Sequence, residues 1–115
     1  MPLAARYLLV LALTLAVEAP VVLLCLRSSP WKRVLAALLV ANLLSHPALH
    51  FLLPRLISMQ QVGVFILVGE GAVFVLEALV YLLVVRPRTA ALAVAAAAGA
   101  NAASYLVGLL LFPTP

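Results

Sequence analysis

Apolar residues run almost without interruption through four segments of the chain, at about 7–26, 33–53, 62–85 and 89–112. Each segment has about 20 residues or more, which at ~1.5 Å per residue of α-helix is enough to cross a hydrocarbon core of ~30 Å. The segments lack the strict alternation of apolar and polar residues that marks the strands of a membrane β-barrel. The pattern therefore predicts an all-α, polytopic membrane protein with four transmembrane helices.

The composition favours the same class. Hydrophobic residues make up 68% of the 115 residues, charged residues make up 9%, and the mean hydropathy is +1.31. Soluble domains are roughly half apolar and a quarter charged. Because a chain of 12.1 kDa cannot hide this much apolar surface from water, lipid is its expected solvent, and residues 1–115 are expected to form a single transmembrane domain.

The first apolar segment could also be a secretory signal peptide, with Val17-Glu18-Ala19 as a poor cleavage site. The apolar run continues past that site to Leu26, and Pro20 would follow the cut. We therefore interpret the segment as a retained transmembrane helix. Pro20 lacks a backbone N–H, so a kink is expected there.

The basic residues predict the orientation in the membrane. The connections after the first and third segments lie on one side and carry Arg27, Lys32, Arg33, Arg86 and Arg88. The other side has only Arg6 and Arg55. The positive-inside rule then places both basic loops in the cytoplasm and both termini outside, in a plasma membrane of bacterial type. Since the charges are spaced as in membrane loops, no nucleic-acid partner is expected.

The two halves of the chain match each other at a constant offset of 59 residues, without a gap. The scarce residue types carry the match: Glu18/Glu77, Arg27/Arg86, Asn42/Asn101, Ser45/Ser104 and Pro54/Pro113. We interpret this as an internal duplication, with repeat one at about 7–56 and repeat two at about 62–115. Because a two-helix unit preserves direction across the membrane, the hairpins are expected to be parallel repeats with pseudo-twofold symmetry about the membrane normal.

Polar residues form layers within these helices. Glu18 and Glu77 each lie eight residues from the predicted cytoplasmic end of their helix. Ionisable groups in a membrane usually face the interior of the bundle, where they find partners. The predicted polar core or ion path consists of Glu18, Asn42, Ser45, Glu70, Glu77, Asn101 and Ser104.

Small residues recur every four positions next to the two asparagines, ending at Ser45 in one repeat and at Ser104 in the other. Such stripes let helix backbones approach closely. We therefore expect the second and fourth segments to be central and tightly packed.

The polar residues that differ between the two repeats suggest a metal site as a weaker alternative. His46 and His50 are four residues apart on one helix face, and together with Glu70 they have the composition of a zinc or iron site. The spacing alone is weak support, so no metal and no cofactor are expected. With no nucleophile motif, no phosphate-binding loop and the single cysteine Cys25, no catalytic residue is assigned, and the chain is not expected to be an enzyme.

The overall plan resembles that of the small multidrug resistance transporters, which also have four helices, a similar length and a glutamate in the first helix. The resemblance implies that Glu18 exchanges protons for cationic substrates. It does not extend to Glu77 or to the two Asn-x-x-Ser motifs.

Two functions follow from the polar core. The favoured interpretation is a small non-enzymatic membrane protein whose buried Glu, Asn and Ser residues hold the bundle together, acting as a structural or assembly subunit. Its partners would be the lipid bilayer and either further copies of itself or other membrane subunits. The alternative is a proton- or cation-coupled transporter of a small solute that uses Glu18 and Glu77, and a membrane metal-dependent enzyme is the weakest interpretation.

Overall fold

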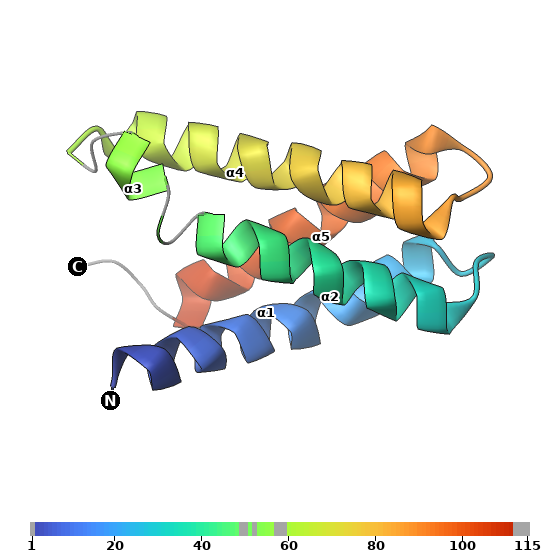
Figure 1. Cartoon of the computed structure of the whole chain (residues 1–115), viewed down its shortest axis with the longest axis horizontal. Helices are drawn as coiled ribbons and strands as arrows, with labels where there is room; N and C mark the ends of the chain where they lie inside the picture. The colour runs from blue at the N-terminus through green and yellow to red at the C-terminus, as the bar shows by residue number, and fades with distance from the viewer. Residues whose placement is uncertain (1, 49–50, 52, 57–59, 112–115) are drawn as a thin grey trace.

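The protein is described from a computed structural model that covers residues 2–48, 51, 53–56 and 60–111. These residues form α1 (Leu3–Cys25), α2 (Trp31–Pro47), the short α3 (Leu53–Leu56), α4 (Val62–Val80), a π-helical turn η2 (Tyr81–Val85) and α5 (Ala90–Leu111). No β-strand occurs among them. The predicted all-α class is therefore confirmed (Figure 1).

Three helices are long and apolar enough to cross a membrane: Leu3–Cys25, the continuous helix Gly63–Val85, and Ala90–Leu111. The second apolar segment gives a shorter helix than predicted, because α2 has 17 residues and ends at Pro47. A helix of that length spans only about 25 Å. Pro47 cannot donate a backbone hydrogen bond to the preceding turn, and the chain changes there from α-helix to π-helix, with Ala48 still in the right-handed helical region and its N–H donating to the Ser45 carbonyl. By contrast, α1 runs through Pro20 without ending.

The neighbours of α1 are α2 and α5, and the neighbours of α4 are also α2 and α5. α2 and α5 also both contact η2. The connections α1–α2 and η2–α5 lie at one end of the bundle, and α3 lies at the other (Figure 1). Both basic connections thus share one end, as their charges predict.

Alanines recur in the interior, beside larger buried side chains such as Leu26 and Tyr81, while most leucines lie outside. Ala37, Ala41, Ala96 and Ala100 are fully buried. Leucines are exposed along every long helix, for example Leu24 at 64% and Leu83 at 68% of their surface. An outer surface of this kind suits lipid, because acyl chains are as apolar as leucine and close contact between helices favours small residues.

The helix that begins with α4 ends in a strained residue. After the π-helical turn, Arg86 adopts φ 53° and ψ 60°, in the left-handed region, and its N–H donates to the Tyr81 carbonyl at 3.3 Å. Among the described residues it is the one non-glycine residue with a positive φ. This conformation costs an L-residue roughly 1–2 kcal/mol and costs glycine almost nothing.

We expect Arg86→Gly to stabilise the protein by about 1 kcal/mol, because glycine removes this strain at the helix end. Thermal unfolding in detergent measures the effect. Arg88→Gly is the matched control, since it removes the same charge from the same loop at a residue without positive φ. Equal stabilisation by both substitutions would attribute the gain to charge and not to backbone conformation.

Candidate functional site

Glu18 lies at the junction of three helices. Its carboxyl is 1% exposed and accepts two hydrogen bonds, from Asn42 Nδ2 on α2 at 3.0 Å and from Ser104 Oγ on α5 at 2.9 Å. Asn42 Nδ2 also donates to its own helix, at the Leu38 carbonyl. Both carboxyl oxygens of Glu18 are therefore satisfied, and the side chain ties α1 to α2 and α5.

Glu77, the counterpart of Glu18 in the second half, has a different environment. It is equally buried, at 1% exposure, yet its Oε2 has no hydrogen-bond partner among the described residues. The residues that correspond to Asn42 and Ser104 are Asn101 and Ser45. Asn101 Nδ2 donates to the Ala97 carbonyl at 2.8 Å, and the buried Ser45 Oγ is likewise without a partner in the described part of the chain. The polar core is thus satisfied around Glu18 and left open around Glu77.

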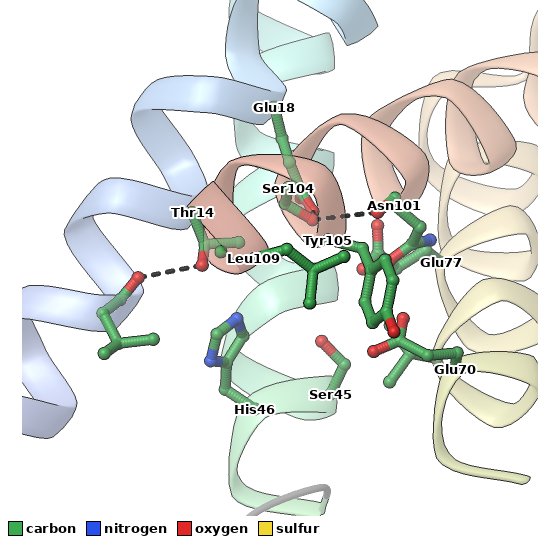
Figure 2. Close-up of a pocket in the computed structure, with 13 residues that line it drawn as sticks. Thr14, Glu18, Ser45, His46, Glu70, Glu77, Asn101, Ser104, Tyr105 and Leu109 are labelled. Atoms are coloured by element: carbon green, nitrogen blue, oxygen red, sulfur yellow. Dashed lines mark hydrogen bonds between the residues drawn. The ribbon is translucent and has the colours of Figure 1, made fainter. Parts of the chain in front are cut away.

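A pocket of about 290 Å³ joins these groups (Figure 2). α1, α2, α4 and α5 all contribute to it, and Glu18, Glu70 and Glu77 all line it. Six of the seven predicted core residues are in its wall: Glu18, Ser45, Glu70, Glu77, Asn101 and Ser104. The seventh, Asn42, is linked to the pocket through its bond to Glu18.

The charge of the pocket has one sign. Its described lining contains three carboxyl groups and neither lysine nor arginine. A second hollow of about 500 Å³, between α4 and α5, shares Glu70, Asn101 and Tyr105 with the first. Carboxyl and hydroxyl oxygens in a medium that excludes water attract cations and repel anions.

Two polar residues of the pocket were not singled out by the sequence analysis. Thr14 donates its hydroxyl to the Val10 carbonyl at 2.8 Å and lines the pocket one turn before Glu18. Its spacing of four residues from Glu18 places both on one helix face, which is the signal that would have identified it. Tyr105, next to Ser104, closes the α5 side.

The histidine candidates are only partly described. His46 lines the same pocket as Glu70 and meets the Tyr7 ring edge-on, with ring centroids 6.4 Å apart. His50 falls outside the described residues. Within the described ranges, no group of three His, Cys, Asp or Glu side chains is arranged to hold a metal ion.

Comparison with known proteins gives no relative for this arrangement: no protein-family model, curated protein or solved structure matches the chain. The class that fold and pocket define is therefore that of a small helical protein with apolar helices of membrane-spanning length and an acidic pocket in its interior.

Proposed function

We propose that the protein is a cation-coupled membrane carrier of a small solute, with the pocket between its four long helices as the binding site. The observation that carries this proposal is the open half of the polar core: Glu77 Oε2 and Ser45 Oγ are buried in the pocket wall without partners among the described residues. A side chain that serves only to join helices gains from being fully hydrogen-bonded, and buried groups left unpaired cost about 1–3 kcal/mol each. Unpaired polar atoms on residues that line a pocket are instead expected of a site that binds something.

The sign of the charge supports a cation as the bound species. Glu18 and Glu77 come from different helices and line the same pocket, with neither lysine nor arginine in its described lining. A carboxyl group in the membrane interior is either protonated or, when ionised, stabilised by a cation or by strong hydrogen-bond donors. Glu18 has two donors, which leaves Glu70 and Glu77 to exchange a cation, and of these two Glu77 is the fully buried one.

A structural or assembly subunit is the second candidate, and one contact favours it. The bonds from Asn42 and Ser104 to Glu18 hold three helices in register, which is what polar residues do in many membrane bundles at about 0.6–2 kcal/mol per bond. In this role the protein would act as a homo-oligomer or beside other membrane subunits. The carrier requires the charge of Glu77, whereas a structural subunit does not.

The proposal includes four membrane spans arranged as two parallel repeats. Its support is the burial pattern, because seven of the nine positions from Glu18 to Ser45 that are buried are buried again 59 residues later, the exceptions being Asn42 and Ser45. The pairs are Glu18/Glu77, Val22/Tyr81, Leu26/Val85, Val34/Ala93, Ala37/Ala96, Leu38/Ala97 and Ala41/Ala100. α2 would then be the shortest of the four spans, and the pocket would lie near the pseudo-twofold axis.

The proposed orientation, with both basic loops in the cytoplasm, gives a direct labelling prediction. In a Cys25→Ala background, cysteines at the exposed positions Ser28 and Thr89 should be shielded from an impermeant thiol reagent added outside intact cells. A cysteine at the exposed Gln60 should react. Labelling of the first two positions but not the third would show the opposite orientation.

Carrier function is tested with purified protein in vesicles that contain a pH-sensitive dye. After a proton or sodium gradient is imposed, a small organic ammonium ion such as ethylammonium or tetramethylammonium is added outside. We expect the added solute to dissipate the gradient faster than in vesicles without protein. If the rate stays equal to that of protein-free vesicles for every gradient and every solute tested, the carrier proposal fails. The structural candidate then takes its place.

A further inference from the structure

Four buried oxygen atoms of the polar core and of the residue next to it on η2 are left without a partner in the described part of the chain. They are Glu77 Oε2, Ser45 Oγ, Asn42 Oδ1 and the Tyr81 hydroxyl, and none has a hydrogen-bond partner among the described residues. Their side chains are between 0% and 1% exposed. Most buried polar atoms in folded proteins are paired, so four orphaned oxygens in one small bundle need a physical explanation.

The four oxygens come from two pairs of residues on helices that face each other. Asn42 and Ser45 are three residues apart on α2, and Glu77 and Tyr81 are four residues apart on α4 and η2. Such spacings place each pair on one helix face. α2 packs against both α4 and η2, and a long side chain on a helix leans toward the N-terminus, so the Tyr81 hydroxyl is directed back to the level of Glu77.

We propose that these oxygens form a binding site for a sodium ion between α2 and α4. Every one of them can act as an oxygen ligand, and the set contains a carboxylate, an amide carbonyl and two hydroxyls. Glu77 and Ser45 also line the central pocket, which gives the ion a route to the site.

The charge of the site favours a monovalent ion. Glu77 is its one carboxylate, because both oxygens of Glu18 already accept hydrogen bonds from Asn42 and Ser104. Calcium takes six to eight oxygens and is usually held by several carboxylates, and magnesium keeps several of its waters. A single carboxylate with three neutral oxygens balances one positive charge. Among the alkali-metal ions, sodium accepts fewer ligands than potassium, for which channels supply a dense set of carbonyls.

The identification of sodium as the coupling ion rests on the carrier function proposed above, whereas the binding site itself does not. A ligand that binds only the folded protein raises its apparent stability in proportion to the logarithm of ligand concentration above the dissociation constant. Thermal unfolding in detergent therefore reports the site without any transport. Sodium chloride is compared with choline chloride and potassium chloride at constant ionic strength.

We expect sodium to raise the melting temperature of the unmodified protein by several degrees relative to choline, with a smaller rise for potassium. Ser45→Ala and Glu77→Gln should lose the sodium-dependent rise. Ser28→Ala is the control: it removes an exposed hydroxyl in the connection between α1 and α2, away from the pocket, so it should keep the full sodium-dependent rise. If Glu77→Gln does not fold, Tyr81→Phe removes one ligand and should increase the sodium concentration for half of the effect by about tenfold.

Equal melting temperatures in sodium and choline for the unmodified protein would overturn the proposal, as would a sodium-dependent rise that survives Glu77→Gln. The outcome is separable from that of the carrier test. Sodium binding without solute-dependent flux would keep this site and remove the carrier function. Solute-dependent proton flux without any effect of sodium would remove this site and keep the carrier function.

Discussion

Glu77→Gln is expected to abolish gradient-driven solute flux in vesicles while leaving the melting temperature in sodium-free buffer nearly unchanged. Glutamine has the size of glutamate and keeps one oxygen acceptor, but it carries no negative charge and takes up no proton. Because Glu77 Oε2 has no hydrogen-bond partner in the described part of the chain, the amide breaks no bond at that atom. The measurement pairs vesicle flux with thermal unfolding of the same preparation.

The leucine variants separate transport from structural support. Glu18→Leu removes the acceptor of two interhelical bonds, from Asn42 and Ser104, and should cost about 1–3 kcal/mol of stability. Glu77→Leu should cost less, because the open half of the core has fewer bonds to lose. Loss of flux in Glu77→Gln with stability intact would sink the structural interpretation. Undiminished flux in that variant would show that Glu77 carries no cation.

Ala96→Leu should destabilise the bundle by about 1–3 kcal/mol or more, because overpacking a close contact forces helices apart. Ala96 is 0% exposed, whereas Ala95, its neighbour in sequence, is exposed. Ala95→Leu is therefore the control, and it should be nearly neutral in detergent. Loss of the folded state on heating, followed by size-exclusion chromatography, measures the difference.

The first half of the chain offers the same comparison. Ala37 is 0% exposed and Ala36 is exposed, so Ala37→Leu should be damaging and Ala36→Leu should be tolerated. Agreement of the two halves would support the proposed repeat as well as the packing. Equal effects at the neighbouring positions would contradict the burial of the small-residue stripes.

The long apolar helices could be predicted from hydropathy and length. In lipid, an apolar segment of that length has few other ways to form hydrogen bonds with all of its backbone groups. The segments at 62–85 and 89–112 correspond closely to the helices that begin at Val62 and Ala90. The end of the α-helical part of α2 at Pro47 was missed, because the apolar composition continues past the proline at which the helix changes from α to π. The π-helical turn at Tyr81 has no composition signal at all.

The candidate site was predictable as a set of residues but not as a set of bonds. Polar residues are scarce in the apolar segments, and their repetition at an offset of 59 residues was enough to select Glu18, Glu77 and Ser45. Which carboxyl is satisfied depends on side-chain rotamers and on small differences in helix separation. Asn42 reaches Glu18, whereas Asn101 donates to the Ala97 carbonyl on its own helix, although the sequence around the two asparagines is closely similar.

The alanine-lined interior gives the molecule a gradient of side-chain volume opposite to that of a water-soluble protein. Most of its leucines face outward, and buried alanines lie among the contacts between its helices. Drift among Leu, Ile, Val and Phe on the outer surface therefore changes little, because acyl chains offer each of them an equivalent environment. At the inner positions occupied by alanine, even one additional methylene has to displace a neighbouring backbone. Substitutions accepted over time should accordingly accumulate on the lipid-facing side, while the buried positions that hold alanine should accept only other small residues.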